Sequence, residues 1–223
     1  NWRCYLYTSH RSEGFLSNLD VDYKAVSYTF FDNKILRLFA YIFSQIHLFF
    51  QLFSLRKQYV IIYVNTLLPF GAALAGKLMG KKVIYHIHET SVKPLVLKRF
   101  LMFVAKKTAS EIIYVSHFLA QDAAISSVPT KVVHNALSND FIEKADIYKK
   151  ERAEKTKKNE NFTALILCSL KDYKGVKVFV ELAKQLPQMS FQLVLNAAQN
   201  DINNYFQDIQ KPDNLSLYPT QSN

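Results

Sequence analysis

Two groups that could do chemistry follow directly after the apolar tract 82–87: the imidazole of His88 and the carboxylate of Glu89. A short apolar run that breaks into polar residues is typical of a buried strand, so both side chains are expected at the strand's carboxyl end. Ligands of open α/β sheets bind in the crevice outside these ends. The two ring nitrogens of an imidazole suit contact with a sugar hydroxyl or a phosphate. We therefore predict that His88 and Glu89 are catalytic residues.

Other predicted strands in the N-terminal part of the chain also end in polar residues. The residues at these ends are Ser9, His10, Asn65, Ser116 and Asn135. Because parallel strands align their carboxyl ends along one edge of a sheet, we expect these side chains to converge on the rim of a cleft. Any single one has an alternative role, since asparagine and serine are also good N-caps for a following helix. The prediction depends on their convergence.

His86 and His88 are two residues apart, so on a strand they point to the same face. With Glu89 nearby, this pair suggests a metal site. The spacing fixes no third ligand, however, whereas metal-binding motifs fix three or four. We therefore expect no metal ion and no resident cofactor, and we interpret His86 as an interior histidine.

A second group of candidate residues lies in the segment 169–176, which joins a predicted strand to a predicted helix. Unpaired N–H groups and a partial positive charge make a helix N-terminus a good phosphate site. Lys174 adds a full charge there, and Gly175 lets the backbone approach a ligand closely. We predict a phosphate site formed by Lys174, Gly175, Lys171 and Ser169. The alternative is an exposed lysine before an ordinary helix.

Short β-rich runs alternate with helical patterns along the whole chain, which predicts parallel sheets built from βαβ units. The predicted strands are 3–7, 23–29, 60–64, 83–87, 111–115, 131–133, 162–168, 191–195 and 215–218. The predicted helices are 34–56, 69–79, 93–109, 117–125 and 175–186.

A charged stretch at 144–160 has almost no apolar content, and we interpret it as a partly helical linker between domains. Residues 1–143 then form an N-terminal Rossmann-like domain with a parallel sheet. Residues 161–223 form a partial C-terminal Rossmann-like domain, since three strands are too few for a whole one. We expect the chain to be a fragment of a larger enzyme, truncated at both ends.

The net charge of +10 predicts an anionic partner, either a phosphorylated substrate or anionic lipid. Nucleic acid is not expected, because the basic residues are scattered and do not alternate with aromatic ones. Cys4 and Cys168 lie far apart, which suits a reducing compartment and therefore the cytoplasm.

The most apolar predicted helix covers residues 35–55, which is long enough to cross a membrane. A narrow stripe of polar residues runs along it, and such groups are costly inside a bilayer. We expect this helix to pack on the sheet or to lie at a membrane surface.

Taken in order, several segments resemble the family 4 retaining glycosyltransferases of the GT-B fold, which build bacterial capsule and other polysaccharides. The matching segments are 60–65, the small-residue helix 71–80, 82–89, 110–116, 131–136 and 173–176. No single segment is specific, but their order and spacing are typical of the family. The resemblance covers most of residues 58–200.

The resemblance implies two Rossmann-like domains that face each other across a cleft, the first binding the acceptor and the second a nucleotide-activated sugar. It places His88 near the donor sugar and Lys174 at the diphosphate leaving group. Family members generally need no metal. This chain has Cys168-Ser169 where the family often has Gly-Arg, so a phosphate-binding cation is missing there, and Lys171 is our proposed substitute.

The function expected from the resemblance is transfer of a sugar, with retention, from a nucleotide-diphosphate donor to a glycan or lipid-linked acceptor. The expected partners are a nucleotide sugar, that acceptor and the inner-membrane surface, with the protein peripheral on its cytoplasmic face. Two alternatives stay open: a GT-B-like sugar-nucleotide epimerase, and a noncatalytic half or membrane scaffold that needs a partner subunit.

Overall fold

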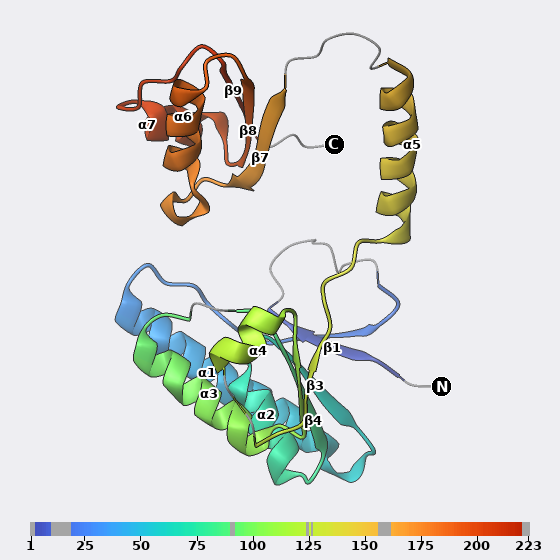
Figure 1. Cartoon of the computed structure of the whole chain (residues 1–223). Helices are drawn as coiled ribbons and strands as arrows, with labels where there is room; N and C mark the ends of the chain where they lie inside the picture. Colours follow the sequence, from blue (N-terminus) through green and yellow to red (C-terminus); the bar gives the residue numbers. More distant parts are fainter. Residues whose placement is uncertain are drawn as a thin grey trace. The chain divides into compact units, whose positions relative to one another are not determined.

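The chain was analysed as a computed structural model, which describes residues 3–9, 19–89, 92–123, 125, 127–155 and 162–219. It divides into two compact units, Asn1–Ala136 and Leu137–Asn223, each with its own apolar core. Both units combine helices with parallel sheets (Figure 1). The α/β class and the Rossmann-like sheets predicted from the sequence are thereby confirmed.

The main sheet of the first unit contains four parallel strands in the order β3-β4-β5-β6. They are β3 (Ile61–Asn65), β4 (Lys82–Ile87), β5 (Glu111–Tyr114) and β6 (Thr130–Val132). The register pairs Asn65 with His86, so β3 and β4 end at nearly the same level. This alignment brings the polar residues that follow the two strands to one edge of the sheet.

The first two strands form a separate ladder. Strand β1 (Tyr5–Thr8) pairs in parallel with β2 (Asp22–Ala25), and in the described part of the chain neither is paired with β3–β6. The expectation that the first strand shares one edge with the others is therefore wrong in this detail. Pairing depends on which edges meet in three dimensions, and an apolar run does not specify its neighbour.

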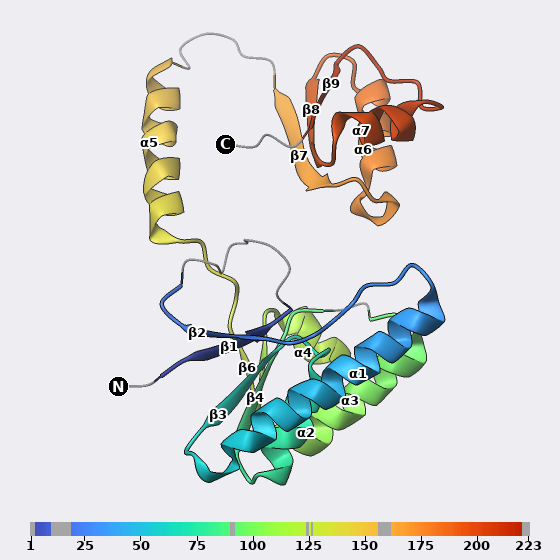
Figure 2. The ribbon, with the colours of Figure 1, turned by 180° about the vertical axis from the view of Figure 1, so that it is seen from behind.

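Three helices cover one face of the main sheet: α1 (Lys34–Phe53), α2 (Phe70–Leu78) and α3 (Leu95–Thr108) (Figure 2). Right-handed crossovers between strands added in one direction place their helices on the same face. The inward residues of the strands, such as Val83 and Tyr85, are fully buried under these helices, whereas Tyr63 on the opposite face is exposed. The short helix α4 (His117–Ala123) connects β5 to β6.

Helices α1 and α2 approach each other closely at Gly71. A Cβ atom added to Gly71 would lie 2.1 Å from the main-chain oxygen of Gln45 in α1. The buried side chain of Gln45 accepts a hydrogen bond from the Gly71 N–H over 3.1 Å. Gln45 thus satisfies one of the free N–H groups at the start of α2, where Pro69 offers no side-chain cap.

The second unit holds a three-stranded parallel sheet in the order β7-β8-β9. Its strands are β7 (Thr163–Ser169), β8 (Ser190–Asn196) and β9 (Leu215–Tyr218), connected by α6 (Val176–Gln185) and α7 (Gln199–Phe206). Before them, the charged stretch predicted as a linker overlaps α5 (Asn139–Lys155). No helix was predicted from the sequence at the residues of α7.

Candidate functional site

The first candidate site lies where β3 and β4 end. The Nε2 atom of His88 is 2.9 Å from Oδ1 of Asn65, so a residue after β4 is hydrogen-bonded to the last residue of β3. Because an amide oxygen can only accept, Nε2 of His88 carries the hydrogen and Nδ1 faces away from this bond. The bond fixes the imidazole ring. Of the predicted rim residues that the structure describes, Asn65 is the one hydrogen-bonded to His88.

His86 lies beside this pair on the same face of the sheet. Its ring centroid is 4.1 Å from that of His88, and its Nδ1 is 2.7 Å from the Tyr63 hydroxyl. Burial, and then the nearby His88, lower the pKa of His86. Its Nε2 is buried and has no hydrogen-bond partner among the described residues. His86 is thus half-buried rather than interior, and one of its two ring nitrogens is paired among the described residues.

Glu89 takes part in a different feature, a pocket of about 340 Å³ against α3 and α4. The pocket is lined by Ile87, Glu89, Leu95, Lys98, Arg99, Met102, Leu119, Asp122 and Ala123. One carboxylate oxygen of Glu89 is buried and has no hydrogen-bond partner in the described part of the chain. Lys98 is paired with Asp122 over 3.1 Å. A buried acceptor without a partner, in a mostly apolar pocket, is suited to a ligand that donates a hydrogen bond.

The remaining rim residues that the structure describes, Ser9, Ser116 and Asn135, have no hydrogen bond to His88. The Ser116 hydroxyl accepts a hydrogen bond from the Leu119 N–H over 3.2 Å, which is the capping role considered as its alternative. Asn135 is exposed beyond β6, and Ser9 is exposed after β1. His10 lies outside the described residues.

The second candidate site is the turn between β7 and α6. Ser169 ends β7, a short 3-10 turn covers Asp172–Lys174, and α6 begins at Val176. Gly175 has φ +80°, in the left-handed region that favours glycine. An added Cβ would meet nothing within 4 Å, so the glycine is required by the backbone conformation and leaves the turn open.

Positive charge gathers at this turn. The ammonium groups of Lys171 and Lys174 lie 6.0 Å and 5.4 Å from the centre of the Tyr173 ring. Lys177 is 3.6 Å from Oδ1 of Asp172. Three lysines with one neighbouring carboxylate, at the start of a ten-residue helix, favour an anionic ligand.

Asp172 anchors the turn to α7. The Tyr205 hydroxyl donates a hydrogen bond to Oδ1 of Asp172 over 2.8 Å. Burial, followed by this hydrogen bond, raises the pKa of Tyr205 to about 12, so the phenol keeps its proton and continues to donate. Neither residue was predicted as part of the site. Asp172 lies within the predicted segment 169–176 without having been assigned a role, and Tyr205 lies in α7, which is distant in sequence and carries no motif.

No group of three or more histidine, cysteine, aspartate or glutamate side chains in the described ranges is arranged to hold a metal ion. The two sites offer hydrogen bonding at the ends of β3 and β4 and cationic contact at the start of α6.

The sequence matches no known protein-family model and no curated protein. Solved structures do match. HepE of Anabaena in complex with UDP and glucose has a TM-score of 0.60 at 16% identity, covering 93% of this chain and 58% of that one. A glycosyltransferase from Rickettsia africae gives 0.61 at 17% identity, covering 93% and 57%. UDP-GlcNAc 2-epimerase from Neisseria meningitidis, bound to UDP-GlcNAc, gives 0.52 at 16% identity, covering 92% and 60%.

Proposed function

We propose a function for this chain from its fold, which is that of the GT-B glycosyltransferases. The chain spans less than two thirds of the length of the solved structures it matches. From this premise we propose that it belongs to a glycosyltransferase that uses a nucleotide-diphosphate sugar. We further propose that transfer retains the anomeric configuration, that the acceptor is a glycan or a lipid-linked sugar, and that the product is a polysaccharide. The observation that carries the proposal is the cationic turn at Lys174 and Gly175 before α6.

The turn suits the charge that develops during glycosyl transfer. As the sugar leaves, negative charge accumulates on the departing phosphate, and cations already in place stabilise that transition state. Lys174 supplies a full charge, Gly175 holds the backbone in an open left-handed turn, and the N–H groups of α6 supply further donors. In this proposal Lys171 takes the place of the missing arginine, and Ser169 completes the site.

The end of β4 supplies the proposed contacts to sugar. The bond to Asn65 holds His88 with Nδ1 available to accept a hydrogen bond from a sugar hydroxyl. We assign the neighbouring pocket to an acceptor hydroxyl, because the unpartnered oxygen of Glu89 can accept its hydrogen. No metal takes part in the proposed reaction.

UDP binding to the purified chain tests this proposal, since the matching structures include complexes with UDP. Replacing Lys174 by alanine is expected to weaken UDP binding by roughly tenfold or more, the effect of losing a hydrogen bond to a charged group. Lys184→Ala is the matched control, because Lys184 lies in the last turn of the same helix and is paired with Glu181. Isothermal titration calorimetry measures both affinities. Equal affinities for the two variants would contradict the assignment.

A sugar-nucleotide epimerase is the second candidate, and the likeness to UDP-GlcNAc 2-epimerase supports it. The two functions differ in what happens without an acceptor. An epimerase interconverts UDP-GlcNAc with its epimer, whereas a transferase leaves the sugar configuration unchanged. Product analysis of UDP-GlcNAc by NMR distinguishes them.

A further inference from the structure

Helix α1 turns part of its polar stripe toward the core and a row of apolar residues outward. Its inward side carries the polar residues Ser44 and Gln45 together with Leu48 and Leu52, all buried. Gln45 is bonded to the start of α2 over 3.1 Å, and the Ser44 hydroxyl donates to the main-chain oxygen of Tyr41 over 2.7 Å. The polar stripe of this helix is therefore used for packing within the unit.

The outward side of α1 is apolar. Its residues and their exposed fractions are Ile35 (66%), Phe39 (65%), Phe43 (65%), Ile46 (49%) and Phe50 (64%). Steps of four, four, three and four residues keep these side chains on one stripe along the helix. Continuous apolar surface of this kind marks an interaction site, because a soluble monomer rarely exposes it.

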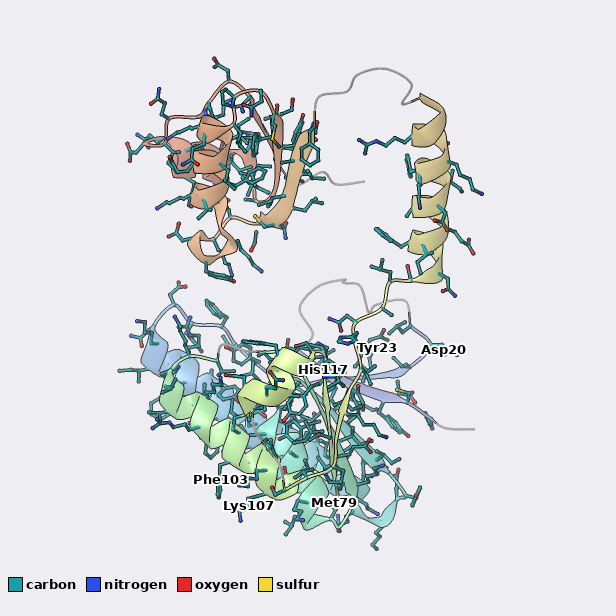
Figure 3. All side chains as sticks on the ribbon, viewed as in Figure 1. Asp20, Tyr23, Met79, Phe103, Lys107 and His117 are labelled. Atoms are coloured by element: carbon teal, nitrogen blue, oxygen red, sulfur yellow. The ribbon has the colours of Figure 1, made fainter. Side chains whose placement is uncertain are left out.

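Helix α3 adds basic residues to the same layer of helices, in which α2 contacts both α1 and α3 (Figures 1 and 2). Val96 and Phe103 are exposed on it, and Lys106 and Lys107 are exposed in its last turn. The Lys107 ammonium lies 5.9 Å from the centre of the Phe103 ring. Figure 3 shows Phe103 and Lys107 at the outer edge of α3, away from the strands.

The charge of the two helices has one sign. Neither α1 nor α3 contains an aspartate or a glutamate. Basic residues lie at both ends of the apolar stripe, with Lys34 and Arg37 at its start and Arg56 and Lys57 just beyond its end. An apolar stripe bordered by cations is complementary to a bilayer whose headgroups are anionic.

We propose that the outer face of α1 and α3 docks on an anionic membrane surface, with the phenylalanines at the boundary of headgroups and acyl chains. By length and composition, Lys34–Lys57 is the one helical segment in the described part of the chain that could cross a membrane. Crossing would remove Gln45 and Leu52 from the core against α2, so a surface position agrees better with the packing. A symmetric contact with a second copy would bring the same basic residues together.

The proposal does not depend on the proposed catalytic function, so it is tested without substrate. Vesicles of phosphatidylcholine, alone or mixed with phosphatidylglycerol, are sedimented with the purified chain. We expect binding mainly to the mixed vesicles, weakening as salt is raised. The double variant Phe43→Gln, Phe50→Gln is expected to bind the mixed vesicles more weakly by a factor of roughly ten or more. The control is Phe118→Gln, because Phe118 on α4 is also 66% exposed but lies outside α1 and α3.

A second pair of variants tests the charges. Lys106→Gln with Lys107→Gln is expected to weaken binding to mixed vesicles at least about fivefold. Lys149→Gln with Lys150→Gln in the exposed helix α5 is the matched control. Circular dichroism and gel filtration establish that all variants are folded.

Four outcomes would overturn the proposal. The first is equal vesicle binding by the phenylalanine variant and its control. The second is equal binding to vesicles with and without phosphatidylglycerol. The third is retention in the membrane after an alkaline carbonate wash, which would indicate a spanning helix. The fourth is a dimer without vesicle binding that the phenylalanine variant dissociates, which would assign the face to a second copy.

Discussion

At the scale of single residues, the hydrogen bonds around β3 and β4 give two adjacent histidines different roles. His88 is bonded to Asn65 at the open end of the sheet, whereas His86 is partly buried behind it and bonded to Tyr63. The sequence shows only that the two imidazoles share a face. Their partners come from the neighbouring strand, 23 residues earlier in the chain in both cases.

His86 makes stability depend on pH. Because its pKa is lowered in the folded protein, mainly by burial, the unfolded chain binds a proton first as the pH falls. The free energy of unfolding is therefore not reduced by His86 above the pKa of the unfolded chain, about 6.5. It decreases as the pH falls from there through the lower pKa of His86 in the folded protein. His86→Gln, which can still bond Tyr63 but binds no proton, is expected to reduce the fall in Tm between about pH 7 and about pH 5.

Differential scanning fluorimetry at the two pH values measures this effect. His134→Gln is the control, because it removes another histidine of the same unit whose Nδ1 is bonded to the Val115 main-chain oxygen. If the fall in Tm between the two pH values is as large in both variants as in the original protein, His86 does not cause the pH dependence.

At the scale of elements, the first unit depends on how closely α2 packs against its neighbours. Gly71 contacts the backbone of α1, and a Cβ added to Gly76 would lie 2.6 Å from Val83 and 3.1 Å from Ile62 in the sheet. These two glycines let α2 fit between α1 and the strands. The segment 71–80 was predicted as a small-residue helix by resemblance, but its neighbours were not.

Gly71→Ala tests this packing. Alanine is the better helix former, by about 1 kcal/mol, so propensity alone predicts a more stable protein. The clash with the rigid main-chain oxygen of Gln45 predicts the reverse, a net loss of about 1–3 kcal/mol in the free energy of unfolding. Urea denaturation followed by circular dichroism measures the change. Lys77→Ala, at an exposed site in the same helix, is the control and is expected to change stability little.

Helix α1 also shows what periodicity leaves open. Its sequence contains a polar stripe and a wide apolar face, and both a buried and a surface position agree with that pattern. In the structure Ser44 and Gln45 of the polar stripe are buried, and Gln45 bonds the otherwise uncapped start of α2. The apolar face is left outside.

At the scale of the whole molecule, the net charge of +10 creates a positive field that attracts anions. UDP is anionic and uridine is neutral, so this field should attract UDP and leave the affinity for uridine unchanged. We expect UDP affinity to fall several-fold when ionic strength rises from about 0.01 M to about 0.15 M, where the Debye length shortens from about 30 Å to about 8 Å. Calorimetry of both ligands at the two ionic strengths measures the difference. A loss of uridine affinity as large as that of UDP would refute an electrostatic cause.

The sequence by itself determined the α/β class, the order of most strands and helices, and the two segments that carry the candidate sites. It could do so because strand and helix periods, polar strand ends and a Lys-Gly turn are local properties of the chain. The sequence also predicted that Asn65 and His88 lie at the same edge of a sheet, but the bond between them is known only from the structure.

Only the tertiary structure decided what each site contains in space. It placed Glu89 in a pocket with Arg99 and Met102, tied Asp172 to Tyr205, and turned the apolar face of α1 outward. It also paired β1 with β2 alone among the described strands. These features join residues that are distant in the chain, and their contacts follow from packing and unsatisfied hydrogen bonds rather than from any local pattern.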